Sequence, residues 1–351
     1  MALFTIPNIA IAGIASCAPK NKESNRDYDW ITHEERELLI KTTGIVNRRV
    51  AAGGITTSDM CFKSAKRLID GLQWKPEDIQ VLIFVSQSPD YFLPATSVLL
   101  QNRLGLPKTT IAFDISLGCS GYVYGLSTIS SLMAHAGIKK GLLLAGDIST
   151  QSVNKKDKST YPLFGDAGTA TALIYDENSK GFHFNLQSDG AGGNAIIIPD
   201  GGLRNPLTKA SFKDEEMSKG IWRNKRNLEL KGVEVFSFSI TEVPPHLKAL
   251  IDFAKVSSEN LDFVVFHQAN KLIIDTIQKI LKLDDHQIPM SLHNYGNTSS
   301  ASIPLTITSQ IATRLENEDL QLAFCGYGVG LSWASVILNT STIYCPALIE
   351  I

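Results

Sequence analysis

The sequence predicts an α/β fold made of two similar halves that meet around buried helices. Its 351 residues are 44% hydrophobic and 19% charged, as in a folded globular chain that is long enough for one large or two medium domains. Residues 74–84 and 256–266 (WKPEDIQVLIF and VSSENLDFVVF) align, and each follows a helical run and ends in a buried strand. This repeat predicts two α/β halves related by a pseudo-two-fold axis.

Apolar β-branched runs predict strands, and amphipathic runs predict helices. The turn-forming segment 176–181 is expected to separate two domains, 1–178 and 179–351. In chain order the pattern predicts a strand at 9–15, a helix at 62–72, a strand at 110–113, a helix at 122–135, a strand at 168–175, a helix at 245–254, strands at 263–266 and 289–292, and a helix at 303–315.

Charge and cysteine content exclude several classes of function. A net charge of −2 without a long basic cluster argues against binding to nucleic acid or an anionic membrane. Five widely spaced cysteines without a CxxC or Cys/His pair predict reduced thiols in a cytoplasmic protein with no metal site. No apolar stretch reaches the roughly 18 residues that span a bilayer. The lipobox-like sequence ending at Cys17 has no Lys or Arg before it, so it fits a buried strand better than an export signal.

The stretch DISLGCSG places Cys119 at a turn between a predicted strand and a predicted helix. Unpaired N–H groups and the positive dipole end of a helix stabilise a thiolate, which favours a nucleophile at this position. The alternative is a small buried hydrophobe. In the repeat, the matching turn of the second half carries Asn297.

His267 directly follows the strand at 263–266, where the first half has Val85. An imidazole in place of an apolar residue indicates function, and a hydrogen-bonded core histidine is the alternative. His293 is the competing candidate.

The least regular segment, residues 181–232, is expected to form an insertion that covers one open end of the molecule. It contains Trp222, Arg223, Lys225 and Arg226. These side chains fit either a solvated loop or a site for a phosphorylated carrier arm.

Six motifs occur in order along the chain: DISLGCSG, FGDAGTA, SDG, HQAN, HNYGNTSSAS and GYGVGLSW. Together they resemble the beta-ketoacyl-acyl-carrier-protein synthase III family of thiolase-fold condensing enzymes. The resemblance implies a layered α-β-α-β-α core and no cofactor. It further implies decarboxylative Claisen condensation of an acyl thioester with a malonyl-carrier, as in fatty acid biosynthesis. Acyl carrier protein is the implied partner, and a homodimer joined through the N-terminal halves is the implied assembly.

The same resemblance implies a catalytic triad of Cys119, His267 and Asn297. The cysteine would carry the acyl group, while the neutral imidazole and the carboxamide would donate hydrogen bonds to the enolate formed when malonyl loses CO₂. The implied oxyanion hole consists of the backbone N–H groups of Cys119 and Val329. Val329 stands where the family usually has a glycine, which adds bulk at the site.

Further contacts follow from matching positions in the family motifs. The acyl pocket is expected to include Phe92, Leu93 and Phe164. Carrier or coenzyme A contacts are expected at Lys158, Asn270 and Lys271. The residues that stack on adenine in housekeeping members are replaced by Leu38 and Thr42, and an arginine associated with carrier docking is replaced by Leu272.

Three alternatives stay open at this point. A thiolase would need a second cysteine, and Cys325 lies one residue from the expected place, which Gly326 occupies. A same-fold acyltransferase acting on a small acceptor, in a specialised-metabolite or surface-glycan pathway, would not need Asn297. A non-catalytic dimer partner would need no triad. The starter acyl group and its donor also stay open.

Overall fold

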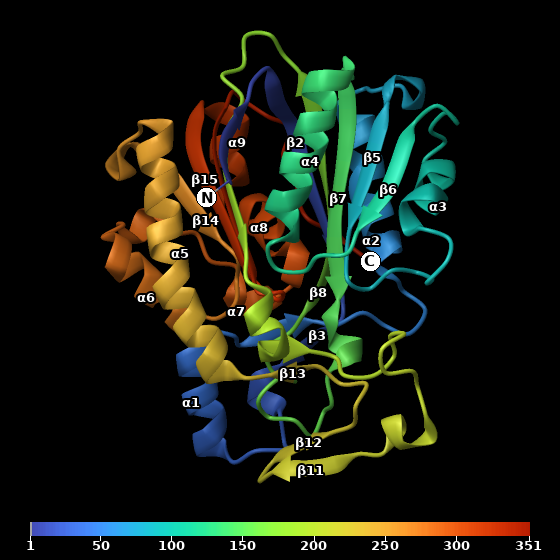
Figure 1. The fold of residues 1–351 in the computed structure, drawn as a ribbon, viewed down its shortest axis with the longest axis vertical. Helices are drawn as coiled ribbons and strands as arrows, with labels where there is room; N and C mark the ends of the chain where they lie inside the picture. Colours follow the sequence, from blue (N-terminus) through green and yellow to red (C-terminus); the bar gives the residue numbers. More distant parts are fainter. Residues whose placement is uncertain (1) are drawn as a thin grey trace.

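Two mixed β-sheets face each other across buried helices in the structure, a computed structural model that describes residues 2–351 (Figure 1). The first sheet has the order β1 (Ala2–Ile6), β9 (Phe182–Ser188), β16 (Ser332–Thr340), β15 (Leu320–Gly328), β14 (Phe263–Phe266). The second has the order β17 (Ile349–Glu350), β2 (Ile9–Ala18), β8 (Asp166–Tyr175), β7 (Lys140–Ile148), β5 (Val81–Val85), β6 (Ile111–Ile115).

Helices complete the five layers. Between the sheets lie α4 (Gly121–Ala136) and the run formed by α8 (Ser302–Thr306), a π-helical turn (Ile307–Ile311) and α9 (Ala312–Asn317). The first sheet is covered by α5 (Gly232–Ala254) and α6 (Lys271–Leu281), and the second by α2 (Thr57–Gly71) and α3 (Thr96–Arg103). The α-β-α-β-α layering expected from the sequence is therefore present.

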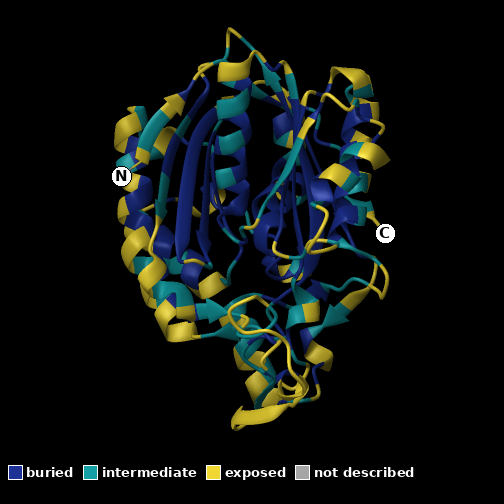
Figure 2. Cartoon of the chain, turned by 45° about the vertical axis from the view of Figure 1, so that its right-hand side comes forward, coloured by how far each residue is buried: buried dark blue, intermediate teal, exposed yellow. Residues whose placement is uncertain are grey.

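The main hydrophobic core lies around α4, between the sheets. Val123, Leu126 and Ile129 of this helix are fully buried, and they pack in one cluster with residues of both sheets and with Ile303. Figure 2 shows the buried strands in the middle of the molecule and exposed residues on the outer helices. Full burial of each aliphatic side chain contributes about 1.5–3 kcal/mol, so this layer fixes the position of the helix that follows Cys119.

The internal repeat has a structural counterpart. A short 3-10 turn precedes β5 at Pro76–Asp78, and an equivalent turn precedes β14 at Ser258–Asn260. The segment 176–181 connects β8 in one sheet with β9 in the other. Each chain end crosses to the opposite sheet, because β1 pairs with β9 and β17 pairs with β2. A division into domains at residue 178 stays a prediction.

Two predicted elements differ from the structure. Residues 289–292 do not form a strand, because the Ser291 N–H donates to the Gln268 side chain at 3.0 Å; a single helical turn, α7 (Leu292–Tyr295), follows. The helix expected at 245–254 begins 13 residues earlier, at Gly232, because buried Val235 and Phe238 extend its apolar face.

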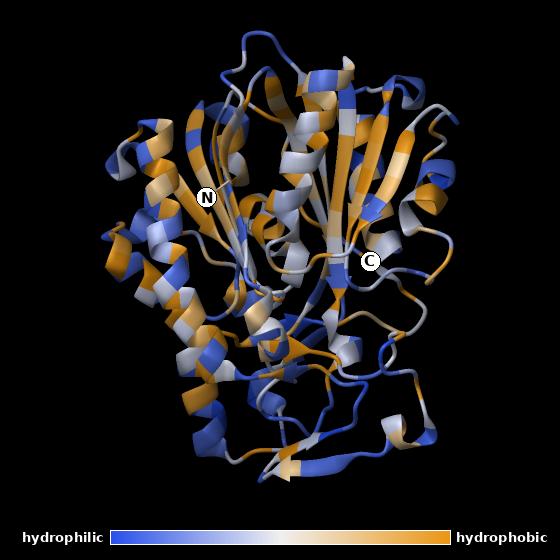
Figure 3. Cartoon of the chain, viewed as in Figure 1, coloured by the Kyte–Doolittle hydropathy of each residue, from blue (hydrophilic) through white to orange (hydrophobic). Residues whose placement is uncertain are grey.

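The irregular segment forms the lower end of the molecule in Figure 3, where hydrophilic colour prevails. Its short strands are β10 (Ile196–Ile197), β11 (Glu215–Ser218), β12 (Ile221–Arg223) and β13 (Glu229–Leu230); α1 (His33–Thr43), β3 (Lys22–Ser24) and β4 (Asn47–Arg49) lie beside them. Of the basic residues singled out in the sequence, Arg223 forms an ion pair with buried Asp157 at 2.5 Å, and Arg226 stacks on Phe212. These contacts give both arginines structural partners.

Among residues 2–351, no helix combines the length and apolar character needed to cross a bilayer.

Candidate active site

A cavity of about 370 Å³ lies at the carboxyl ends of the central parallel strands. Cys119, His267 and Asn297 all line it, although they come from three different loops in the two halves of the chain. Ligands bind preferentially at such strand ends in open α/β sheets. The three side chains predicted to act together therefore share one chamber.

Cys119 lies in the turn between β6 and α4, one residue before the helix cap. Gly328 runs directly against it: a Cβ on that glycine, whose φ is +156°, would lie 2.9 Å from the Cys119 Sγ. The first helical N–H, of Gly121, already donates to the Gly118 carbonyl at 2.7 Å. The sulfur has hydrogen-bonding contacts with the backbone of Val329, the side chain of Ser299 and its own backbone.

Burial raises the pKa of the Cys119 thiol to about 11, even though hydrogen bonds from the Val329 backbone and the Ser299 side chain lower it. Since a desolvated thiolate loses its hydration, the thiol is the resting form at neutral pH. This differs from the low-pKa thiolate expected at a helix terminus. The helix-terminal N–H groups expected to stabilise it are engaged with the Gly118 and Ser120 carbonyls.

His267 directly follows β14 and is 1% exposed. Its Nδ1 lies 2.7 Å from the Ser302 Oγ, and the Tyr327 ring packs edge-on against the imidazole at 5.6 Å between centroids. Burial lowers the pKa of His267 to about 3, while a backbone hydrogen bond at Ser299 opposes this shift. The imidazole is therefore neutral throughout the physiological pH range.

Asn297 is held by contacts on both sides of its backbone and on its side chain. Its N–H donates to the Leu163 carbonyl at 2.9 Å, and its carbonyl accepts from the Gly165 N–H at 2.9 Å. The side-chain Oδ1 accepts from the Ser299 N–H, also at 2.9 Å. With the oxygen engaged in this way, the Nδ2 donor is the free end of the carboxamide.

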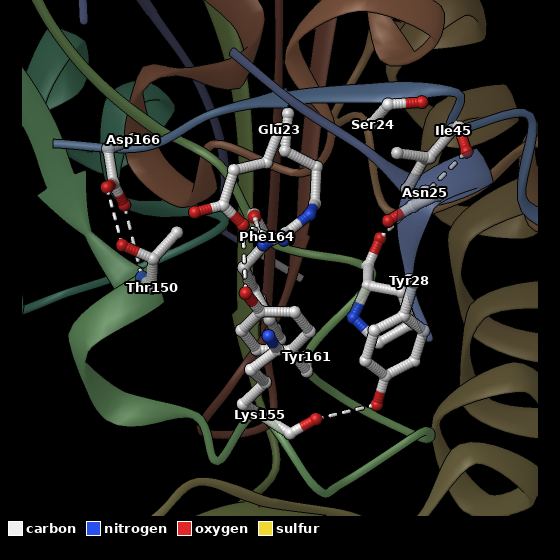
Figure 4. Close-up of polar contacts among 12 residues, drawn as sticks. Glu23, Ser24, Asn25, Tyr28, Ile45, Thr150, Lys155, Tyr161, Phe164 and Asp166 are labelled. Atoms are coloured by element: carbon white, nitrogen blue, oxygen red, sulfur yellow. Dashed lines mark hydrogen bonds and ion pairs between the residues drawn. The ribbon is translucent and has the colours of Figure 1, made fainter. Parts of the chain in front are cut away.

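The segment that positions Asn297 is itself anchored by a buried arginine. Arg48 is 2% exposed, donates to the Phe164 carbonyl at 3.0 Å and to Glu23 at 2.7 Å, and stacks on Tyr161. The Tyr161 hydroxyl also donates to Glu23 (Figure 4). This network fixes the backbone of Phe164, which lines the cavity and pairs with Asn297.

Asp147, which the sequence reasoning missed, joins the two halves at the cavity. One carboxylate oxygen accepts from the Gln87 N–H at 2.7 Å; the other accepts from the Ser300 hydroxyl at 2.8 Å and the Ser300 N–H at 3.2 Å. Burial raises the pKa of Asp147, and these hydrogen bonds oppose that shift. The carboxylate thus holds the loop that carries Asn297 against the end of β5.

The variant Asp147→Asn is expected to lower the rate of malonyl decarboxylation by about tenfold and to lower the rate of acyl transfer less. An asparagine offers one acceptor oxygen, so one of the two backbone N–H groups would face an amide donor, at a cost of about 1–3 kcal/mol. Malonyl decarboxylation and acylation of Cys119 are measured separately. Asp157→Asn is the matched control, because this carboxylate is also fully buried but does not line the cavity. Equal loss of both partial reactions in Asp147→Asn would contradict this account.

The other predicted site residues divide into two groups. Asn270 lines the cavity and also caps α6, its side chain accepting from the Ile273 N–H at 2.9 Å. The remaining four do not line the cavity: Phe92 and Leu93 are 92% and 86% exposed, Lys158 pairs with Glu35, and Lys271 pairs with Asp275. The predicted pocket contacts of Phe92 and Leu93 are therefore not made within their own chain, because their loop projects outward.

The two alternative site residues, Cys325 and His293, lie outside the cavity. Cys325 is fully buried, burial raises the pKa of its thiol to about 12, and its neighbour is Ser335. It does not line the cavity, and neither does the exposed His293. Within residues 2–351, no group of three or more His, Cys, Asp or Glu side chains is arranged to hold a metal ion.

Comparison with known proteins gives consistent matches. A family model described as 3-oxoacyl-[acyl-carrier-protein (ACP)] synthase III matches residues 113–190, and a model of the C terminal of these enzymes matches residues 251–340. Among curated proteins, a beta-ketoacyl-[acyl-carrier-protein] synthase III from Lactococcus lactis subsp. lactis is 31% identical over 94% of this chain and 98% of that protein. The protein of the same name from Rhodopirellula baltica is 33% identical over 95% of this chain and 99% of that protein.

Among solved structures, a 3-oxoacyl-(acyl-carrier protein) synthase from Burkholderia xenovorans superposes with a TM-score of 0.94 at 36% identity. The match covers 99% of both chains. The layered fold described above is therefore the thiolase-like fold of these enzymes.

Proposed function

This chain belongs to the 3-oxoacyl-[acyl-carrier-protein] synthase III family of thiolase-like condensing enzymes, and on that premise we propose that Cys119, His267 and Asn297 carry its reaction. It is an acyltransferase of the synthase III type. The observation that supports the residue roles best is that a nucleophile and two neutral hydrogen-bond donors line one cavity from separate loops.

In the first step Cys119 takes the acyl group from a thioester donor. The sulfur forms a bond to the acyl carbonyl carbon, the bond from that carbon to the donor sulfur breaks, and the thiol proton passes to the departing thiolate. The oxyanion is held by the backbone N–H groups of Cys119 and Val329. Since Gly328 lies against the sulfur, the Val329 N–H is close enough to serve this purpose.

In the second step malonyl-carrier loses CO₂, and its thioester oxygen becomes an enolate. The Asn297 Nδ2 is free to donate to that oxygen because Oδ1 is engaged by the Ser299 N–H. The proposed role requires the His267 tautomer that carries its proton on Nε2, in which Nδ1 accepts a hydrogen bond from the Ser302 hydroxyl 2.7 Å away. The enolate carbon then attacks the acyl-Cys119 carbonyl, and collapse of the adduct releases the cysteine and a 3-oxoacyl-carrier.

Because burial lowers the pKa of His267 to about 3, the imidazole is expected to stay neutral from pH 5 to pH 9. The depressed pKa also means that the unfolded chain takes up a proton below about pH 6.5 that the native chain does not, so stability falls as pH falls toward 4. Nuclear magnetic resonance of ¹³C-labelled histidine, assigned with His267→Ala, measures this titration. A midpoint near 6.5 would contradict the neutral-donor role.

The partner and the assembly belong to the same proposal. Acyl carrier protein is the expected carrier of the malonyl group. A homodimer through the N-terminal halves would cover the apolar loop at Tyr91, Phe92 and Leu93, which is 62%, 92% and 86% exposed. The pocket contact predicted for Phe92 and Leu93 would then be made in the second copy. Five free cysteines are consistent with a reducing cytoplasm.

The test of the overall reaction is product analysis with an acyl thioester and malonyl-carrier. We expect 3-oxoacyl-carrier and CO₂ in equal amounts, identified by mass spectrometry of the carrier. A same-fold acyltransferase would instead form an ester or amide of a small acceptor without malonyl-carrier. A non-catalytic dimer partner would form no acyl-enzyme.

A further inference from the structure

One wall of the cavity is polar and is built from the ends of neighbouring parallel strands. β5 pairs in parallel with β6 on one side and with β7 on the other. The residues that follow these strands therefore lie side by side: Cys119 after β6, Gln87 after β5, and Ser149 after β7. All three line the cavity.

Gln87 lies against the residue that precedes the nucleophile. A Cβ on Gly118 would meet the Gln87 Oε1 at 2.4 Å and the Val329 Cγ1 at 2.9 Å, so the absence of a side chain at position 118 makes the space that the carboxamide occupies. The Gln87 backbone is fixed as well, because its N–H donates to Asp147 at 2.7 Å. The position of the carboxamide beside Cys119 is therefore set by both its backbone and its packing.

Among the described residues, the Gln87 carboxamide and the Ser149 hydroxyl make no hydrogen bond within the chain. Ser88, which also lines the cavity, differs: its hydroxyl contacts Thr57 at 2.8 Å and accepts from the Ile148 N–H at 2.9 Å. The rest of the lining is mainly apolar: Leu163, Phe164, Leu230, Val235, Phe236 and Ile273. The Gln87 side chain is exposed in the single chain, so water solvates its carboxamide in the free enzyme. An alkyl chain that covers the carboxamide removes this water, and a polar group left unsatisfied in this way costs about 1–3 kcal/mol.

We propose that Gln87 is a specificity-determining residue that selects an acyl group with a hydrogen-bonding oxygen, an oxo or hydroxyl group near carbon 3, over an unsubstituted alkyl group. The carboxamide can donate to an oxo group and can either donate to or accept from a hydroxyl group. A site that pairs a substrate oxygen discriminates against the analogue that lacks it, because the protein group is then left unpaired. This inference rests on the proposed acylation of Cys119.

The experiment compares thioesters of N-acetylcysteamine, which avoids recognition of coenzyme A or a carrier. The acyl groups are 3-hydroxybutanoyl, 3-oxobutanoyl and, as length-matched alkyl groups, butanoyl and pentanoyl. The rate of Cys119 acylation is followed by intact-protein mass. We expect at least one of the two oxygen-bearing groups to react about tenfold faster than butanoyl. Gln87→Leu should reduce that ratio to about one.

Gln151→Leu is the matched control, since Gln151 is exposed and does not line the cavity, and it should keep the wild-type ratio. Equal or faster reaction of the alkyl thioesters with the wild type would overturn the inference and leave the proposed function intact. The inference would also be overturned if Gln87→Leu kept the wild-type ratio of acylation rates, or if Gln151→Leu lost that ratio as Gln87→Leu does. No acylation by any thioester would overturn both.

Discussion

Replacing Cys119 with alanine is expected to abolish formation of the acyl-enzyme and to lower condensation by roughly 10⁴-fold or more. In the proposed mechanism the Cys119 sulfur carries the acyl group covalently, and loss of this nucleophile removes the whole two-step route. The measurement is intact-protein mass after incubation with an acyl thioester, combined with the steady-state rate of 3-oxoacyl-carrier formation.

Cys325→Ala is the matched control for this variant, because Cys325 is a buried cysteine that does not line the cavity. It should keep both the mass adduct and the rate. If Cys325→Ala lost condensation as severely as Cys119→Ala while remaining folded, a thiolase-like mechanism with two cysteines would replace the one proposed. An adduct that persists in Cys119→Ala would show that the acyl group is bound elsewhere.

Replacing His267 or Asn297 with alanine is expected to lower malonyl decarboxylation by about 10²–10³-fold each while Cys119 still becomes acylated. Each variant removes one preorganised donor to the enolate oxygen, and loss of a single donor of this kind has an effect of that size. Acylation depends on the sulfur and the two backbone N–H groups, which these substitutions leave in place. Release of ¹⁴CO₂ from labelled malonyl-carrier and intact-protein mass measure the two steps independently.

The matched controls are His293→Ala and Asn294→Ala. They remove the same side-chain types from α7 at positions that do not line the cavity. Both should decarboxylate malonyl-carrier at the wild-type rate. Normal decarboxylation in His267→Ala and Asn297→Ala would contradict the assigned roles, since it would mean that the enolate is stabilised by other groups.

Much of the architecture could be predicted because burial leaves a direct pattern in the sequence. The apolar runs at 9–15, 168–175 and 263–266 all lie in observed strands, and the amphipathic run at 122–135 lies in α4. These strands are buried on most sides and are therefore mainly apolar, and the face of α4 that packs in the core carries the apolar part of its pattern. The pattern failed at 289–292, where a side-chain contact from Gln268 to the Ser291 backbone replaces a strand partner.

The candidate site could be predicted only in part. Cys119 and His267 drew attention because they place reactive side chains at a turn and at a strand end of the repeated α/β pattern, whereas the triad with Asn297 was implied by the family resemblance. Asp147 and Ser302 were not, since their roles arise from contacts between distant loops that leave no local signal. The low-pKa thiolate expected for Cys119 also fails, because a local helix-terminus argument does not include the desolvation that the folded cavity imposes.

The most direct test of the account is discharge of a preloaded enzyme. Cys119 is acylated, free thioester is removed, malonyl-carrier is added, and the mass of the enzyme is followed together with CO₂ and carrier products. The account predicts that the acyl adduct disappears as CO₂ and 3-oxoacyl-carrier appear, in a ratio of one to one to one. Loss of the acyl group to water or a small acceptor without CO₂ release, or an adduct that malonyl-carrier does not discharge, would contradict it.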